Sequence, residues 1–264
     1  MNILVYDSMS ALRARLEKSS EPALMLMRGV VNDALRSDRI TIWAWDTYGG
    51  NEARRAIFPG YKNRPPSPNP VIAALGLLKE LLAHTPAFQI SQPGFEGDDL
   101  VAATVERFRG KGHEITILTK DGDLSQLATT HDVTCTAKVK HGAGVIPPAL
   151  VPLYKLTVGD KSDTIPGLHA FGPMAWDRCD KADLTRFLDR VISDRDVNET
   201  EALTIGLSKA TIKWLGTQEG ADQLCAMKRI IAPLPMTDEQ FNTALTRGTD
   251  NPQAREAILS RFQL

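Results

Sequence analysis

The chain of 264 residues has little of what marks a secreted or membrane-bound protein. Its three cysteines, Cys135, Cys179 and Cys225, are far apart and odd in number. They indicate buried thiols in a reducing compartment rather than a disulfide framework or a zinc site. The longest apolar runs, such as 71–78, fall far short of the roughly 20 residues that cross a bilayer. An acid, Asp7, follows the first residues without a basic leader, so we expect no secretory signal and a cytoplasmic location.

A strong excess of either charge is also missing. There are 31 Lys and Arg residues against 32 Asp and Glu residues, a net charge of −1. Taken alone, this argues against a nucleic-acid-binding protein, which usually carries a basic patch. Hydrophobic residues make up 42% of the chain, enough for a real core, so a disordered chain is excluded. The length suits one large domain or a domain and a half.

Short apolar segments alternate with longer helical patterns in the first half of the chain. We expect strands at 2–6, 40–45, 88–91 and 114–118, and helices at 10–37, 69–83 and 96–110. This alternation is typical of an α/β fold, a parallel sheet with flanking helices on both faces. Trp43 and Trp45 share one strand face, and we interpret them as packing residues.

Beyond about residue 150 the pattern changes, because no convincing strands follow, only short helical segments and turns. We therefore expect an α/β domain at 1–150 and a helical module at 151–264. Between the second strand and the next helix, residues 47–70 are polar and rich in proline, and a loop this long inside a compact domain is usually functional. Its basic residues are Arg54, Arg55, Lys62 and Arg64.

Acidic residues follow each of the four expected strands. In an open parallel sheet ligands bind at the carboxyl ends of the strands, so these side chains should converge on one edge. Two further acids, Asp160 and Asp163, lie three residues apart on one helical face. The full set is Asp7, Asp46, Glu96, Asp98, Asp99, Asp121, Asp123, Asp160 and Asp163.

Without these nine acids, 31 basic residues face 23 acidic ones, so the rest of the chain is basic. Two like charges about 4 Å apart repel by roughly 4 kcal/mol at an effective dielectric near 20, and several such pairs need cations to stay ionised. Oxygen ligands without His or Cys favour Mg²⁺ or Mn²⁺. Alone, each acid could be a helix cap or a surface residue. Their joint occurrence at successive strand ends favours a two-metal site for phosphodiester chemistry.

At these residues the chain resembles the 5′ nucleases: the flap endonucleases, the 5′-nuclease domain of bacterial DNA polymerase I and the phage 5′–3′ exonucleases. The resemblance covers roughly residues 3–176, and its motifs occur in family order. These motifs are Val5-Tyr6-Asp7, Trp45-Asp46, Phe58-Pro59-Gly60-Tyr61-Lys62-Asn63-Arg64, Phe95-Glu96-Gly97-Asp98-Asp99, Thr119-Lys120-Asp121-Gly122-Asp123 and Gly159-Asp160-Lys161-Ser162-Asp163-Thr164-Ile165-Pro166-Gly167.

The resemblance implies a PIN-like nuclease domain at 1–150, a basic arch at about 47–70, and a helix–three-turn–helix DNA-binding module with C-terminal helices within 151–264. It implies two Mg²⁺ or Mn²⁺ ions on the nine acids, and a K⁺ ion at the hairpin of that module. The residues it assigns to catalysis are Lys62, Glu96, Asp98, Asp121 and Asp123. The residues it assigns to DNA are Arg54, Arg55, Tyr61, Lys62, Arg64, Gly167 and Gly172.

The activity implied is hydrolysis of DNA at or near 5′ ends, as a 5′–3′ exonuclease, a 5′-flap endonuclease or both, in replication or repair. The expected partners are DNA with 5′ ends, flaps or nicks, and also RNA–DNA hybrids, bound by a monomer in the cell or in a phage's host cytoplasm. A PIN-type ribonuclease and a catalytically silent DNA-binding relative stay open as alternatives. The hairpin departs from the family, since Ala170 and Met174 stand where a glycine and a phosphate-binding lysine are usual.

Overall fold

The computed structural model describes residues 1–10, 23–63 and 69–261, and its chain divides into two compact units. The sheet unit comprises Met1–Gly50, Pro65–Lys138 and Leu234–Leu264. The helical unit comprises Asn51–Arg64 and Val139–Pro233. Among the residues so described, no helix has both the length and the apolar character that a bilayer crossing requires.

The sheet unit is built on a six-stranded sheet in the order β5-β4-β1-β2-β3-β8. The first five strands in the chain run parallel: β1 (Asn2–Asp7), β2 (Arg39–Ala44), β3 (Phe88–Ile90), β4 (Glu114–Leu118) and β5 (Val133–Cys135). The chain builds outward from β1 on one side through β2 and β3, then returns to the other side for β4 and β5. The order of the strands therefore reverses between β1 and β4, the place where open α/β sheets bind ligands.

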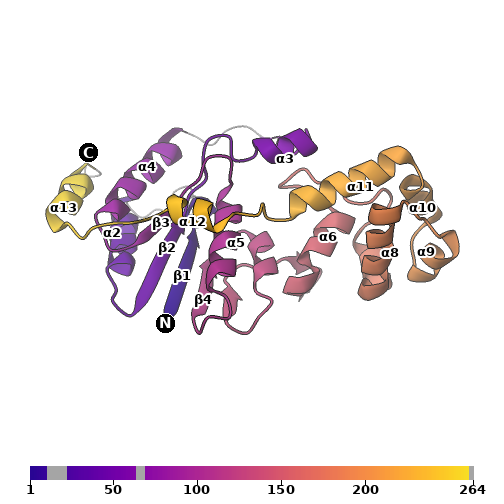
Figure 1. Ribbon diagram of the computed structural model, residues 1–264, viewed down its shortest axis with the longest axis horizontal. Helices are drawn as coiled ribbons and strands as arrows, with labels where there is room; N and C mark the ends of the chain where they lie inside the picture. The colour runs from indigo at the N-terminus through magenta and orange to yellow at the C-terminus, as the bar shows by residue number, and fades with distance from the viewer. Residues whose placement is uncertain (11–22, 64–68, 262–264) are drawn as a thin grey trace. The chain divides into compact units, whose positions relative to one another are not determined.

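Alternate side chains of these strands fill two cores, one on each face of the sheet. On one face Ile3, Val5 and Ile42 pack with α5 (Gly97–Phe108) and α12 (Asp238–Ala244). On the other, Trp43 and Trp45 are buried against α2 (Ala23–Ala34), α4 (Asn69–Ala83) and α13 (Pro252–Ser260). Figure 1 shows these two helical layers on either side of the strands. The expected α/β sheet and the packing role of both tryptophans are confirmed.

The last strand corrects the expectation that strands end before residue 150. β8 (Leu245–Arg247) pairs antiparallel with β3 at the edge of the sheet. With only three residues, it carries no readable alternation, and its position depends on the preceding α12. Three short strands before residue 150 were not expected either: β5, β6 (Lys140–His141) and β7 (Gly144–Val145), the last two forming an antiparallel hairpin.

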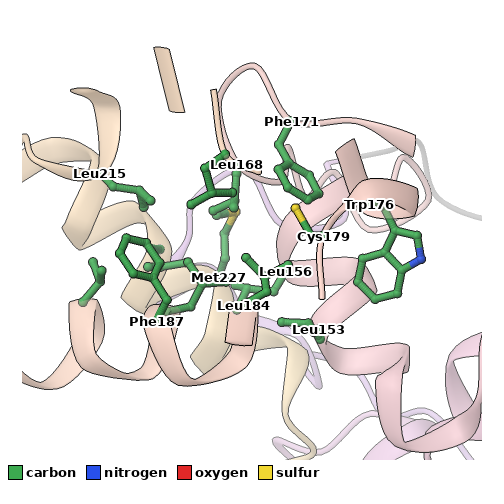
Figure 2. Close-up of a cluster of buried hydrophobic side chains, with 14 of the residues drawn as sticks. Leu153, Leu156, Leu168, Phe171, Trp176, Cys179, Leu184, Phe187, Leu215 and Met227 are labelled. Atoms are coloured by element: carbon green, nitrogen blue, oxygen red, sulfur yellow. The ribbon is translucent and has the colours of Figure 1, made fainter. Parts of the chain in front are cut away.

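The helical unit surrounds a single apolar core. Within Val139–Pro233 its α-helices are α6 (Val151–Val158), α7 (Pro173–Arg178), α8 (Lys181–Asp194), α9 (Glu199–Ile205), α10 (Lys209–Leu215) and α11 (Gln218–Ile231). Figure 2 shows Leu156, Leu184, Phe187 and Met227 meeting in this core, where all four are buried. Asp180 caps α8 by accepting bonds from the backbone of Ala182 and Asp183, and Asn198, Ser208 and Thr217 cap the next three helices in the same way.

The basic stretch at 47–70 is not a continuous loop. Residues Glu52–Ile57 form α3, and Asn51–Arg64 packs with the helical unit. Residues 11–22 of the expected helix 10–37 and residues 64–68 of the stretch, Arg64 included, lie outside the described residues. The division into domains at residue 150 stays a prediction.

Candidate active site

In the sheet unit, Asp7 lies at the carboxyl end of β1, beside the point where the strand order reverses. Its side chain is buried, and Thr119, the first residue after β4, donates its hydroxyl to Asp7 Oδ2 at 2.7 Å. The backbone N–H of Ser10 reaches Asp7 Oδ1 at 3.2 Å. Two neighbouring parallel strands thus end at one carboxylate, which is held by neutral donors.

The Asp7 carboxyl is buried and lies near two other acids, Asp46 and Asp121. Burial is the largest influence on this carboxyl and, with the nearby charges of Asp46 and Asp121, it raises the pKa to about 6. The hydrogen bonds from Thr119 and Ser10 act in the opposite direction but do not outweigh it. Acids that follow β1, β2 and β4 therefore lie close enough to repel one another, as expected from the sequence.

Asp46, directly after β2, is fixed by the start of the next helix. The N–H of Gly97 donates to Asp46 Oδ1 at 2.5 Å. A Cβ at Gly97 would lie 3.1 Å from this oxygen, so the close approach favours glycine. Thr47 adds bonds from its hydroxyl to the carbonyls of Gln92 and Phe95, both at 3.0 Å. The loop that carries Asp46 is thereby tied to the loop that carries Glu96.

Three acids gather at the amino end of α5. Glu96 is its buried N-cap, and Asp98 and Asp99 lie in its first turn, where carboxylates complement the helix dipole. Asp99 is fully buried. Its Oδ2 accepts from the N–H of Glu96 at 3.0 Å, and its Oδ1 accepts from the N–H of Leu234 at 2.8 Å. Both oxygens are engaged by backbone, so Asp99 holds the returning C-terminal segment, and its assignment as a metal ligand stays a prediction.

The last acids of this unit follow β4. Asp121 caps the 3₁₀ helix η1 (Gly122–Leu127) by accepting from the N–H of Asp123 at 2.9 Å. The N–H of Asp121 itself donates to Thr119 Oγ1 at 2.9 Å. Asp121 and Asp123 are both half-buried. This spacing makes a tight turn that presents two carboxylates in succession.

In the helical unit, Asp160 and Asp163 lie on a compact turn. Backbone bonds of 2.8 Å run both ways between Asp160 and Ile165, and Ser162 donates its N–H and hydroxyl to Asp160 Oδ1. Gly159 and Gly167 flank this turn with φ of +90° and +76°. A Cβ at either position would come within 2.7 Å of backbone atoms, so both glycines are required.

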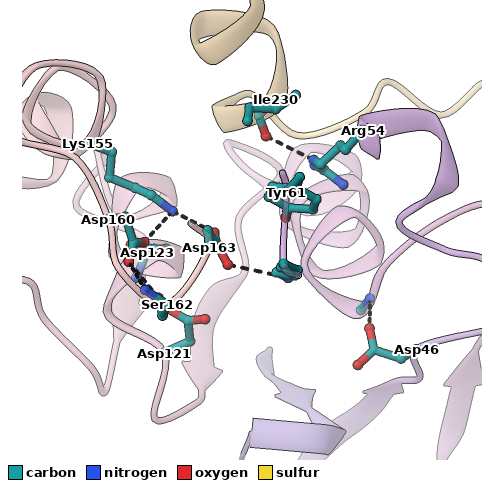
Figure 3. Close-up of polar contacts among 12 residues, drawn as sticks. Asp46, Arg54, Tyr61, Asp121, Asp123, Lys155, Asp160, Ser162, Asp163 and Ile230 are labelled. Atoms are coloured by element: carbon teal, nitrogen blue, oxygen red, sulfur yellow. Dashed lines mark hydrogen bonds and ion pairs between the residues drawn. The ribbon is translucent and has the colours of Figure 1, made fainter. Parts of the chain in front are cut away.

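A buried lysine lies between these two acids. Lys155 Nζ is 2.9 Å from Asp160 Oδ2 and 2.9 Å from Asp163 Oδ2, as Figure 3 shows. Burial alone would raise the pKa of Asp160, but the Lys155 ammonium and the bonds from Ser162 outweigh it and hold the pKa at about 2. Sequence reasoning missed Lys155 because it lies in an otherwise apolar helix. A single charged residue inside that apolar run, five residues before Asp160, was the feature that could have indicated a buried ion pair.

Lys62 approaches the same turn. Its Nζ is 3.8 Å from Asp163 Oδ1, and its backbone N–H donates to the Asp163 carbonyl at 3.1 Å. Tyr61, expected to stack on a nucleotide, is only 3% exposed and belongs to the core of the helical unit. The structure thus brings Lys62 to Asp163, while a stacking role for Tyr61 stays a prediction.

The expected DNA contacts have varied surroundings. Arg54 is buried, and Arg55 is exposed but donates to the carbonyls of Tyr61 and Lys62. In the turn that precedes α7, which the resemblance assigns to the DNA-binding hairpin, Ala170 has a φ of +53°, the conformation for which a glycine is usual. Met174, on α7 itself, is 79% exposed. Gly172 is extended, with open space where a Cβ would lie.

The donor set suits a hard cation. The candidate ligands in both units are carboxylate oxygens alone, with no His or Cys among them, and the crowding of charge at Asp7 favours a bound cation. Such ligands select Mg²⁺ or Mn²⁺ over softer metals.

Comparison with known proteins places the chain in a family. The family model for the 5′–3′ exonuclease N-terminal resolvase-like domain matches residues 9–149. A 5′–3′ exonuclease of Aquifex aeolicus is 33% identical over 130 residues, which is 46% of this chain and 45% of that protein. DNA polymerase I of Deinococcus radiodurans is 26% identical over 221 residues, 80% of this chain and 22% of that protein. The matches therefore span less than half the length of these curated relatives.

Among solved structures, bacteriophage T5 5′-exonuclease with bound zinc ions shares the fold, with a TM-score of 0.51 and 16% identity over 99% of this chain and 97% of that one. The T5 D15 flap endonuclease in a pseudo-enzyme–product complex with DNA and metal ions is more distant, with a TM-score of 0.45, 14% identity and coverage of 100% of this chain and 98% of that one. Because the family model covers more than half of the sequence, the chain belongs to the 5′–3′ exonuclease family.

Proposed function

We propose that the protein is a divalent-metal-dependent 5′ nuclease that hydrolyses DNA phosphodiesters at or near 5′ ends. The observation that carries the proposal is the gathering of Asp7, Asp46 and Asp121 at the carboxyl ends of β1, β2 and β4 in a member of this family. In the sheet unit the metal ligands would be these acids with Glu96, Asp98 and Asp123. In the helical unit they would be Asp160 and Asp163.

Bound Mg²⁺ or Mn²⁺ would supply an activated water and stabilise the charge that develops on the leaving oxygen. Side-chain and backbone groups of the chain hold the proposed ligands by hydrogen bonds. Thr119 and Ser10 hold the Asp7 carboxylate by neutral bonds that do not compete with a cation, and the N–H of Gly97 orients Asp46. In the helical unit, Lys155 is bonded to both Asp160 and Asp163, so a bound cation would share these carboxylates with its ammonium.

Lys62 would add a positive charge at the scissile phosphate. Its ammonium lies 3.8 Å from Asp163 Oδ1, beside one of the proposed metal ligands. A fixed donor of this kind acts chiefly on the transition state and is worth on the order of 100- to 1000-fold in rate. No histidine base is needed in this scheme.

We propose DNA with 5′ ends, flaps or nicks as the substrate, and RNA–DNA hybrids as a second one. One gel tests both. The protein is incubated with 5′-flap, nicked, blunt and single-stranded DNA, with a hybrid and with single-stranded RNA, in Mg²⁺ and in chelator. Metal-dependent products that begin at 5′ ends are expected. Binding without cleavage would instead indicate a silent relative, and cleavage of single-stranded RNA alone would indicate a ribonuclease.

The double variant Asp121→Asn with Asp123→Asn tests the metal ligands. Cleavage should be abolished while DNA binding persists or tightens, because removal of two negative charges lessens repulsion of phosphate. The matched control is Asp194→Asn with Asp196→Asn, an acidic pair of the same spacing at the end of α8. Near-normal cleavage by the first variant at saturating Mg²⁺ would show the assignment to be wrong.

A further inference from the structure

Arg54 has an environment unlike that of a DNA-binding arginine. It lies on α3 and is only 4% exposed. Its Nε donates to the carbonyl of Ile230 at 2.9 Å, and one terminal nitrogen donates to the carbonyl of Ala232 at 3.2 Å (Figure 3 shows the first bond). These carbonyls belong to the last turn and the C-cap of α11, which carry the negative end of the helix dipole. The guanidinium therefore joins α3 to the end of α11.

The same guanidinium reaches the residue before Lys62. Its central carbon lies 5.8 Å from the centre of the Tyr61 ring, within the range of a cation–π contact. The ring is buried in the core of the helical unit. Arg54 therefore contacts both the end of α11 and the aromatic ring of the residue that precedes Lys62 in the chain.

The backbone at Lys62 needs such support. Lys62 has a φ of +45°, a conformation that disfavours a residue with a Cβ and persists only where its surroundings impose it. Here Arg55 donates to the carbonyls of Tyr61 and Lys62, and the Lys62 N–H donates to the carbonyl of Asp163. Hydrogen bonds therefore hold both the N–H and the carbonyl of the strained residue. The preceding residue, Tyr61, is held by the apolar core and by its contact with Arg54.

We propose that Arg54 is a positioning residue for Lys62. It fixes α3 and Tyr61 on the end of α11, so that the strained turn presents the Lys62 ammonium beside Asp163. The proposal rests on the proposed nuclease function, in which Lys62 acts on the scissile phosphate. It departs from the sequence expectation that Arg54 binds the DNA strand directly.

The test is a double-mutant cycle on DNA cleavage. Arg54→Met keeps the length of the side chain but removes its donors, and it should lower kcat about 10- to 100-fold with little change in KM, since misplacement of about 1 Å costs this much. In a Lys62→Met background the same substitution should change kcat less than about two-fold, because the group it positions is gone. Arg54→Lys, which retains the charge and is expected to fold, should lose most of the same activity, because an ammonium cannot bridge both carbonyls and the ring.

The matched control is Arg229→Met, which removes an exposed arginine from the last turn of the same helix, α11. It should leave kcat unchanged. Loss of DNA affinity with an unchanged kcat in Arg54→Met and Arg54→Lys would make Arg54 a DNA contact and overturn the proposal. An equal loss of kcat with and without Lys62 would overturn it as well.

A second measurement does not depend on activity. Hydrogen exchange of peptides spanning Phe58–Asn63 should quicken in Arg54→Met or Arg54→Lys but not in Arg229→Met, because the Lys62 N–H bond to Asp163 loosens. Unchanged exchange in both Arg54 variants would refute the positioning role. If wild-type protein cleaves no DNA, the nuclease proposal fails, while the exchange experiment still decides whether Arg54 holds the turn.

Discussion

Backbone strain in the described chain is concentrated at single residues of the helical unit. Four residues other than glycine have positive φ in the described part: Lys62, Thr164, Ala170 and Arg195. Arg195 ends α8, an ordinary place for the left-handed conformation. The other three lie in the loops that carry the proposed catalytic lysine, the Asp160–Ile165 turn and the hairpin. Such strain persists where the neighbouring structure imposes it, and it often marks functional loops.

Ala170 offers a direct test of this strain. The left-handed conformation of Ala170 costs the folded state roughly 1 kcal/mol relative to glycine. Replacement by glycine removes this cost, but the greater conformational entropy of glycine in the unfolded chain cancels part of the gain in stability. Ala170→Gly should therefore raise the free energy of unfolding by about 0.5 kcal/mol. The control Ala175→Gly, inside α7, should lower it by about 0.5–1 kcal/mol. Urea unfolding measures both; destabilisation by Ala170→Gly would mean that the conformation is not strained.

Lys155 bridges the two acids of the folded turn. Its replacement by methionine leaves Asp160 and Asp163 without their shared buried cation, and breaking a buried pair costs roughly 3 kcal/mol. We expect Lys155→Met to lose about that much stability in chelator and to regain part of it in Mg²⁺. Lys228→Met, which breaks the exposed pair with Asp189, should cost less than about 1 kcal/mol. Equal losses in the two variants, measured by denaturant unfolding, would contradict a special role for Lys155.

At the scale of elements, four of the five parallel strands could be predicted because each is a short apolar run with an acid at its end or in the loop that follows; β5, three residues long, could not. The expected strands at 2–6, 40–45 and 114–118 agree with the structure within one residue at each end, and α4 agrees at both ends. What could not be predicted was α3, which is six residues long in a stretch of Gly, Pro and Arg, and β8, which is three residues long. Their conformations depend on distant partners, the end of α11 for α3 and strand β3 for β8, rather than on local pattern.

The cap of α8 makes an element-scale prediction with a pH dependence. Asp180 accepts from the N–H groups of Asp183 and Ala182 at 2.9 Å, and the bond from Asp183 is the main reason that its pKa lies below the ordinary value. A lowered pKa means that the stabilisation is present above roughly pH 4 and is lost as the pH falls below it. Asp180→Ala should therefore lower Tm at pH 7 but by much less at pH 3.

The control for this cap is Asp180→Asn, which keeps the side-chain acceptor without the titrating charge. Its Tm difference from wild type should change with pH in the same sense, near zero at pH 3 where both caps are neutral and larger at pH 7. A Tm deficit of Asp180→Ala that stays constant from pH 7 to pH 3 would show that the charge of the cap contributes nothing.

At the scale of the whole molecule, the sequence could predict that acids after successive strands lie near one another, but not how the chain divides between two units. Asp7, Asp46 and Asp121 follow strands, and parallel strands end on one edge, so their gathering follows from local pattern. In contrast, Asn51–Arg64 joins Val139–Pro233 across some 75 intervening residues. Arg54 and Tyr61 are buried in that association, and neither is distinguishable by sequence from an exposed residue of a basic loop.

Met174, at the start of α7 and next to the turn that contains Ala170, can be tested for contact with DNA. Met174 is 79% exposed on α7, at the position where relatives are expected to bind phosphate through a lysine. The wild-type protein should therefore bind duplex DNA weakly, with a shallow dependence on salt. Each added phosphate contact steepens the dependence of log K on log salt by nearly one unit, so Met174→Lys should tighten binding and add about one to the slope. The measurement is affinity for a nicked duplex across a salt series, in Ca²⁺ to suppress cleavage.

The matched control is Met25→Lys, which adds the same charge at a methionine that is 61% exposed on α2 of the sheet unit. A general gain in positive charge would tighten binding equally in both variants, because long-range attraction does not distinguish positions well at low salt. A direct contact acts at one place only and changes the slope there. If Met174→Lys and Met25→Lys behave alike, or if neither changes the slope, the hairpin does not face the duplex and the assignment of Gly167 and Gly172 to DNA binding is wrong with it.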